Sequence, residues 1–204
     1  MTDSPPPASP SIIRGAEMVV VLDLEWTAWE GSRERRWGAP GEYREVVQIG
    51  AVKLDGGSAL GERESFDLLV RPRRNRVLSD YFIGLTGIDQ ARLDAKGVDF
   101  AEAFKRFSAF LGPPRGPVLS AGYDGWILEE NCRLCGMPFT LDRGRFFTIT
   151  PMIVSALGVD EKYFMSSRLP ELLDFPPPGR AHDAAGDARC IAEALRILLR
   201  RDPV

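Results

Sequence analysis

The first apolar run of the chain ends in two carboxylates. Residues 18–26 read MVVVLDLEW, which predicts a strand that is buried on both faces. Alternate residues of a strand share a face, so we expect Asp23 and Glu25 to lie side by side. Buried acids repel each other and lose their hydration, and a fold keeps them only if their charge is compensated. The fold must therefore supply a partner for these two acids.

Two more acids interrupt apolar patterns later in the chain. Asp187 falls on the same helical stripe as Ile191, Leu195 and Leu198, which should face the core. Asp124 lies at a predicted junction between a strand and a helix, where helix capping is an equally good explanation. No arginine falls on the inward faces that these patterns define. Two divalent cations would neutralise four carboxylates, and hard oxygen ligands suit Mg²⁺ or Mn²⁺.

The order of apolar segments predicts an α/β fold. Three strands come first and are joined by short turns, of which Asp55-Gly56-Gly57 is typical of a hairpin. Helices and short strands then alternate, a pattern that favours one mixed sheet covered by helices. The predicted strands are 18–26, 46–54, 60–70, 118–121 and 146–149, and the predicted helices are 79–94, 99–111, 126–135 and 183–200.

Length and composition place these elements in one domain. The chain has 204 residues, of which 44% are hydrophobic and 27% are charged, so it has enough apolar side chains for a sizeable core. Residues 1–16 are rich in proline and are expected to form a disordered tail. Residues 17–204 are then the folded domain.

Composition also bears on the compartment and on the partners. No stretch approaches the roughly 18 uncharged apolar residues of a membrane span, and the first residues do not have the pattern of a signal peptide. Three cysteines favour a reducing compartment, so we expect a cytoplasmic protein that does not bind membranes. The formal net charge is −3, and contacts with nucleic acid would therefore depend on local basic patches.

The chain has a single histidine, His182, just before the last predicted helix. Asp183 is suited to cap that helix, and Asp187 follows one turn inside it. An imidazole on this loop would lie near the acids, and its ordinary pKa of about 6.5 suits proton transfer near neutral pH. On composition alone, an exposed histidine or one with an internal partner is the better explanation, and it is the spacing to Asp183 and Asp187 that favours a role in proton transfer.

Taken in order, these residues resemble a known family. Asp23-x-Glu25-x-Thr27, the distal Asp124 and His182-x4-Asp187 resemble the DEDDh group of 3′→5′ exonucleases, which includes RNase T and proofreading exonucleases. The flanking segments look most like the Eri-type 3′ exoribonuclease branch. These segments are Val70-Arg71-Pro72, Leu85-Thr86-Gly87-Ile88, Gly122-Tyr123-Asp124 and Gly179-Arg180-Ala181-His182. The resemblance runs from about residue 19 to residue 199.

The resemblance implies a fold, a reaction and a set of roles. It implies an RNase H-like fold with a five-stranded mixed sheet flanked by helices, formed by residues 17–204 as an exonuclease domain. It implies hydrolysis from the 3′ end of single-stranded RNA, favoured over DNA, or of 3′ overhangs, with two Mg²⁺ or Mn²⁺ ions. The implied metal ligands are Asp23, Glu25, Asp124 and Asp187, the implied general base is His182, and the implied substrate contacts are Trp26, Thr27, Leu85 and Thr86.

Two other functions stay open on the sequence alone. A DNA 3′→5′ exonuclease of the repair or proofreading type would use the same residues. A catalytically silent module that binds nucleic acid would keep the fold, although all five catalytic positions are filled. The sequence identifies no protein partner.

Two basic segments and a cysteine pair also have competing explanations. The arginines of the first segment either contact a phosphate backbone or lie on a solvated loop. The tryptophans of the second segment either stack on a base or pack at the surface. A core-facing pair explains Cys132 and Cys135 better than a zinc site, which needs four ligands. The basic segments contain Arg71, Arg73, Arg74 and Arg76 in one loop, and Arg33, Arg35 and Arg36 with Trp29 and Trp37 in another.

Overall fold

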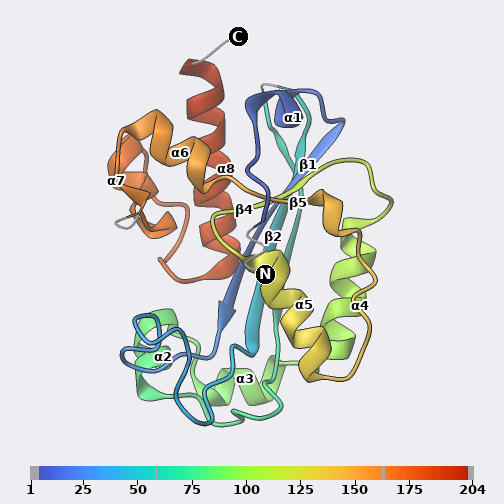
Figure 1. The fold of residues 1–204 in the computed structure, drawn as a ribbon, viewed down its shortest axis with the longest axis vertical. Coiled ribbons are helices and arrows are strands. Elements are labelled where there is room, and N and C mark those ends of the chain that lie inside the picture. The colour runs from blue at the N-terminus through green and yellow to red at the C-terminus, as the bar shows by residue number, and fades with distance from the viewer. Residues whose placement is uncertain (1–4, 58, 162–163, 202–204) are drawn as a thin grey trace.

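A five-stranded mixed sheet forms the centre of the molecule (Figure 1). The computed structural model describes residues 5–57, 59–161 and 164–201. The strand order is β3-β2-β1-β4-β5, in which β1, β2 and β3 are antiparallel neighbours while β4 pairs in parallel with β1 and β5. This arrangement confirms the predicted α/β fold with a mixed sheet flanked by helices. The strands are β1 Met18–Trp26, β2 Val46–Asp55, β3 Glu62–Leu69, β4 Val118–Ser120 and β5 Phe146–Thr148.

Helices cover both faces of the sheet. The long helix α8 packs against β1 and β2 on one face, and α4 and α5 pack on the other (Figure 1). We refer to these faces as the α8 face and the α4–α5 face. The helices are α1 Pro10–Arg14, α2 Asp80–Thr86, α3 Gln90–Lys96, α4 Phe100–Leu111, α5 Asp124–Leu134, α6 Thr150–Leu157, α7 Leu169–Leu173 and α8 Ala184–Arg201, with short 3-10 turns at Arg143–Arg145 and Ser166–Arg168. Among them, no helix is both long and apolar enough to cross a bilayer.

The two layers of helices explain why β1 is apolar on both faces. Val19 and Val21 belong to the core cluster under α8, whereas Val20 and Leu22 belong to the cluster under α4 and α5. All four side chains are fully buried. Burial of a side chain of this size contributes about 1.5–3 kcal/mol, so β1 is tightly held and its end is a rigid support.

The predicted helix over residues 79–94 is in fact two short helices. Gly87 ends α2 with φ of 72°, a left-handed conformation that glycine adopts without a steric penalty. Asp89 then begins α3, and its side chain accepts a hydrogen bond from Arg92 N at 2.7 Å. The helical periodicity continues across the break, which is why the sequence pattern did not reveal it.

The expectation of a disordered tail over residues 1–16 needs correction for its described part. Ser9 caps α1, and Ile13 is 0% exposed within the core under α8. Ala8 N donates to Thr148 O at 2.8 Å, which attaches this segment to β5. Buried apolar surface and backbone hydrogen bonds hold a segment whose prolines suggested disorder. Residues 1–4 lie outside the described part of the chain.

Candidate active site

The carboxyl-terminal end of β1 presents two acids to the α8 face. Asp23 and Glu25 alternate with the buried Leu22 and Leu24, as the strand pattern predicted. Glu25 is 8% exposed, and Asp23 is half-buried. No hydrogen bond or ion pair between described groups involves either carboxylate. The end of β1 therefore carries buried negative charge with no protein partner among the described residues.

Asp124 reaches the same place from α5. Because β4 runs parallel to β1, the chain leaves β4 beside the end of β1 and enters α5 there. The Asp124 carboxylate accepts a hydrogen bond from Leu24 N at 3.0 Å and is 4% exposed. Tyr123 occupies the N-cap position, and it makes no capping bond with its side chain. Capping thus does not account for Asp124, which lies in the first turn of the helix.

The start of α8 brings in His182 and Asp187. Asp183 caps the helix as expected, because its carboxylate accepts a hydrogen bond from Gly186 N at 3.2 Å. Asp187 accepts a hydrogen bond from the backbone N–H of His182 at 3.0 Å. His182 has a left-handed backbone with φ of 60°, which is uncommon outside glycine. Asp187 therefore holds the histidine loop in an unusual conformation beside the acids.

Three of the predicted residues come within reach of a common centre. One ligand atom each from Glu25, His182 and Asp187 lies within 4.8 Å of the other two. Asp23 and Asp124 lie close to this group. The charge of Asp124 raises the pKa of both Glu25 and Asp23, and the charge of Glu25 raises the pKa of Asp23. The structure thus gathers five residues that the sequence spreads over three segments.

Burial raises the pKa of the four acids, and their mutual repulsion adds to the effect. Burial, followed by repulsion from Asp124 and Glu25, holds the pKa of Asp23 well above its ordinary value. Burial and repulsion from Asp187 and Asp124 raise the pKa of Glu25 to about 8. Burial also raises the pKa of Asp124 and of Asp187 to about 6, and backbone hydrogen bonds to their carboxylates oppose this rise. The cluster favours binding of positive charge.

The donor set fits divalent cations. Four carboxylates supply the hard oxygen ligands that Mg²⁺ and Mn²⁺ prefer. No described ion pair places an arginine or lysine against them. Cations would therefore meet negative charge that the protein has left uncompensated.

The predicted substrate contacts are placed differently. Trp26 packs against the core of the α4–α5 face and contacts Trp37 with ring centroids 6.0 Å apart. It points away from the acids because neighbouring residues of a strand alternate in direction. The structure therefore does not bring Trp26 to the candidate centre. Leu85 is half-buried on α2, at the end of the helix that Gly87 terminates.

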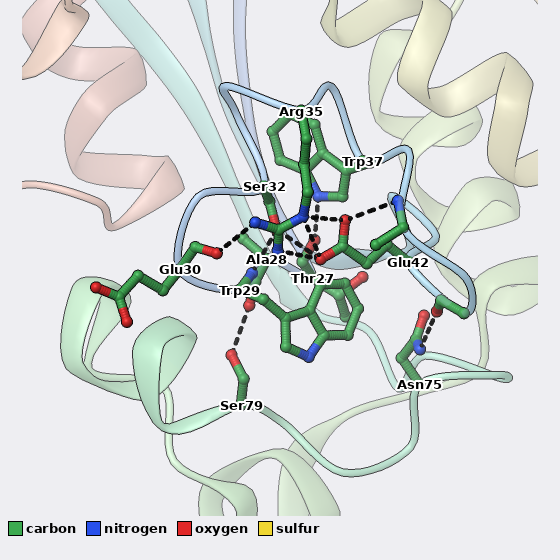
Figure 2. Close-up of polar contacts among 12 residues, drawn as sticks. Thr27, Ala28, Trp29, Glu30, Ser32, Arg35, Trp37, Glu42, Asn75 and Ser79 are labelled. Carbon is green, nitrogen blue, oxygen red and sulfur yellow. Dashed lines mark hydrogen bonds and ion pairs between the residues drawn. The ribbon is translucent and has the colours of Figure 1, made fainter.

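The two threonines use their hydroxyl groups within the protein. Thr27 Oγ1 donates to Tyr43 O and accepts from Glu45 N at 3.1 Å. The carbonyl of Thr27 also accepts a hydrogen bond from Trp37 Nε1 at 2.8 Å (Figure 2). Thr86 Oγ1 donates to Phe82 O and accepts from Ile88 N at 3.1 Å. The Thr27 hydroxyl thus stabilises the segment that follows β1, and the Thr86 hydroxyl stabilises the end of α2.

One residue that supports the site was missed from the sequence. Gln48 on β2 is 0% exposed, and its Nε2 donates to Asp67 Oδ1 and to Asp183 Oδ1, both at 2.8 Å. Its Oε1 accepts from Ala184 N at 3.1 Å. Gln48 thus holds the first residues of α8 against the sheet. The signal in the sequence is a single amide within the apolar run VVQIGAV.

Gly50 allows the same close approach. A Cβ at this position would lie 2.1 Å from the backbone carbon of Ala184. Any larger residue at position 50 would push the start of α8, and with it Asp187, away from Glu25.

Comparisons with known proteins show the family of the chain. The chain is 25% identical to rat (Rattus norvegicus) 3'-5' exoribonuclease 1 over 195 residues, which covers 89% of this chain and 53% of that protein. It is 27% identical to the 3'-5' exonuclease crn-4 of Caenorhabditis elegans over 195 residues, covering 90% of this chain and 63% of that protein. The chain thus spans about half to two thirds of the length of these two relatives.

A solved structure shares the fold. The nuclease domain of 3'hExo, described as a DEDDh family member bound to rAMP, superimposes with a TM-score of 0.77 at 23% sequence identity. The match covers 92% of this chain and 94% of that one. The family model for the RNase T exonucleases matches residues 20–195, which include all five residues of the candidate centre. The chain therefore belongs to the RNase T exonuclease family.

Proposed function

We propose that the protein is a metal-dependent 3′→5′ exonuclease that hydrolyses phosphodiester bonds from the 3′ end of single-stranded RNA or of 3′ overhangs. The observation that carries this proposal is the cluster of four carboxylates, two of which, Glu25 and Asp187, lie beside the one histidine. The cluster has raised pKa values and no cationic protein partner among the described residues. Membership in the exonuclease family supports the reaction class.

Asp23, Glu25, Asp124 and Asp187 would hold two Mg²⁺ or Mn²⁺ ions. When bound, such ions supply positive charge that stabilises the negative charge developing on a phosphodiester during attack. Asp124 and Asp187 each accept a backbone hydrogen bond, whereas Asp23 and Glu25 have no donor among the described residues. Buried carboxylates with so few donors cost stability until cations bind.

His182 is the group placed to accept a proton from the attacking water. Burial, and then the nearby Arg180, lower the pKa of its imidazole, so it is neutral and able to accept a proton at pH 7. The hydrogen bond from its backbone to Asp187 holds the loop in position. Because Asp187 is itself one of the four acids, the base and the metal-holding residues are positioned together.

RNA is the proposed substrate because the relatives favour it. The rat relative is named an exoribonuclease, and the structure of 3'hExo that shares this fold contains rAMP. A DNA exonuclease is the alternative from the same reaction class, and a silent binding module is the alternative from another. A cytoplasmic location stays a prediction from the three cysteines, which are free thiols.

The test compares RNA and DNA oligonucleotides of one sequence, labelled at either end, with Mg²⁺ and with a chelator. Release of labelled mononucleotide from the 3′ label, and a shortening ladder from the 5′ label, would support the proposal. We expect faster turnover of RNA, and no turnover with the chelator. Cleavage from the 5′ end, or turnover that survives the chelator, would refute it. Calorimetric titration of Mn²⁺ that shows no binding would favour the silent module.

A further inference from the structure

A second concave site lies on the face opposite the acids. It is a groove of about 580 Å³, lined by Arg71, Arg73 and Arg76 from the loop after β3 and by Phe100 and Asn131 from the α4–α5 face. Val46, another lining residue, pairs with Trp26, the residue that follows Glu25. The groove and the acid cluster therefore share one end of the sheet and lie on opposite sides of it.

A buried glutamate builds the wall of this groove. Glu45 is 4% exposed, and its carboxylate accepts hydrogen bonds from the backbone N–H groups of Arg73, Arg74 and Asn75 at 2.6–3.1 Å. Asn75 Nδ2 also donates to Gly41 O, which ties the loop to the segment before β2 (Figure 2). Three successive amides held by one carboxylate fix the course of the loop. The arginine side chains therefore start from a rigid backbone.

These arginines keep their charge available. No ion pair among the described residues uses a side chain of the loop 71–76, whereas many arginines elsewhere have carboxylate partners. Arg71 donates to Asp94 O at 3.4 Å and Arg76 donates to Arg73 O at 3.2 Å, and both acceptors are neutral carbonyls. All three lining arginines are exposed.

The acids that line the groove have other hydrogen-bond partners. Asp99 caps α4 by accepting from Glu102 N at 2.9 Å, and Asp94 accepts from Gln90 Nε2 at 2.9 Å. The Glu45 carboxylate accepts hydrogen bonds from the backbone amides of the loop. These carboxylates keep their negative charge, but no ion pair among the described residues joins them to the lining arginines, whose guanidinium groups retain free donors for an anion.

We propose that this groove binds the phosphodiester backbone of the substrate, upstream of the nucleotide that is cleaved. The inference rests on the proposed exonuclease function. Guanidinium groups donate in pairs to phosphate oxygens, and a row of them follows a strand without reading its sequence. Because the groove lies across the β-sheet from the acids, a nucleic-acid strand bound at the acids reaches the groove only by passing around the end of the sheet. We therefore expect a dinucleotide bound at the acids not to reach the groove.

The test is a triple variant, R71A/R73A/R76A, measured on a dinucleotide and on a 20-nucleotide single strand. The matched control is R63A/R115A/R168A, which removes the same charge from exposed arginines outside the groove. For three lost phosphate contacts we expect KM for the long strand to rise about tenfold and its salt slope to fall by about 2. Turnover of the dinucleotide should stay within about twofold of wild type, as expected for contacts made only by upstream phosphates.

Equilibrium binding separates this proposal from the proposed function. Fluorescence anisotropy of a labelled 20-nucleotide strand in chelator measures the affinity of the protein for the strand without any cleavage. Wild type that binds the strand but does not cut it with Mg²⁺ would refute the exonuclease function alone. A triple variant that binds the long strand as the control does, or that loses dinucleotide turnover equally, would overturn the groove.

Discussion

Glu25 and Glu45 are buried glutamates near the same end of neighbouring strands, yet they have opposite surroundings. Glu25 is 8% exposed, lies among other acids, and accepts no hydrogen bond from any described group. Glu45 is 4% exposed and accepts hydrogen bonds from three backbone amides. One carboxylate is left for a cation to neutralise, and the other is satisfied by the protein itself.

The difference teaches how to separate a functional acid from a structural one. Burial alone does not do so, because Glu45 is buried more deeply than Glu25. What differs is the number of hydrogen-bond donors that face each carboxylate. A buried charge without donors costs free energy, and a fold retains it where a ligand compensates that cost. Glu25 lies among other acids and accepts no hydrogen bond from any described group, so it meets this criterion.

The same conservative substitution at both glutamates should produce the largest contrast. Glu25→Gln removes a charge that cations need, and we expect kcat to fall about a thousandfold, which corresponds to about 4 kcal/mol of lost transition-state stabilisation. Single-turnover assays with Mg²⁺ would measure the loss. Metal-free Glu25→Gln should unfold at a higher denaturant concentration than wild type at pH 7. Burial and repulsion raise the pKa of Glu25 to about 8, and the neutral amide avoids the cost of keeping a carboxyl protonated at this position.

Glu45→Gln should behave in the reverse way. Replacing one carboxylate oxygen with an amide leaves backbone donors unpaired, so we expect the free energy of unfolding to fall by about 2 kcal/mol. Turnover of a dinucleotide per folded molecule should stay near the wild-type value. If Glu45→Gln also lost a thousandfold in kcat on a dinucleotide, the contrast between the two glutamates would be wrong.

His182→Ala should give the next largest effect. Loss of a general base lowers kcat by about a hundredfold or more. The pKa of His182 is lowered, so wild-type activity should decline only where acid protonates the imidazole. The variant should lose that limb of the pH–rate profile, which tests the base role directly. An unchanged profile would assign His182 a structural role in the loop.

The stability of the metal-free protein should depend on pH in an unusual direction. Since the folded-state pKa values of Asp124, Asp187 and Glu25 are raised to about 6, 6 and 8, the folded state binds more protons than the unfolded one above about pH 4. The free energy of unfolding should therefore fall as pH rises from about 4 to 8. Denaturant titrations in chelator would measure this. Added Mn²⁺ should remove the dependence, and a flat curve in chelator would contradict the shifts.

Gln48→Met should produce the smallest change. The variant keeps a similar volume on β2 but loses the bonds to Asp183 and to Ala184 N. We expect kcat to fall about tenfold with KM nearly unchanged, an effect typical of lost support for active-site ligands. Gln48→Glu retains an acceptor for Ala184 N and should recover part of the rate. A change in stability with no change in kcat would limit Gln48 to a structural role.

Much of the site could be read from local patterns. The acids of β1 are conspicuous because the alternation of a strand places them in an apolar environment. Asp187 is conspicuous because it falls on the apolar stripe of a helix. The start of α8 and its cap at Asp183 also follow from local chemistry. For Asp23, Glu25 and Asp187 the signal is a polar residue where the period of the element demands an apolar one, and for Asp183 it is the preference for Asp at a helix start.

Other features depend on contacts between distant segments. The prolines of residues 5–14 suggested disorder, but Ile13 is buried by a core that only the folded chain assembles. The sequence does not show that the hydroxyls of Thr27 and Thr86 are used by nearby carbonyls and amides. The sequence also does not show that Glu45 accepts a hydrogen bond from the backbone of Arg73, 28 residues away, since no local pattern links the two residues.

The amino-acid sequence by itself determined the sheet, the two faces of β1 and the identity of the acids, because periodicity and residue chemistry are local properties. Only the tertiary structure decided which of the acids remain without donors, because hydrogen-bond partners come from segments far apart in the chain. The raised pKa of Glu25 and the satisfied carboxylate of Glu45 both follow from that long-range packing.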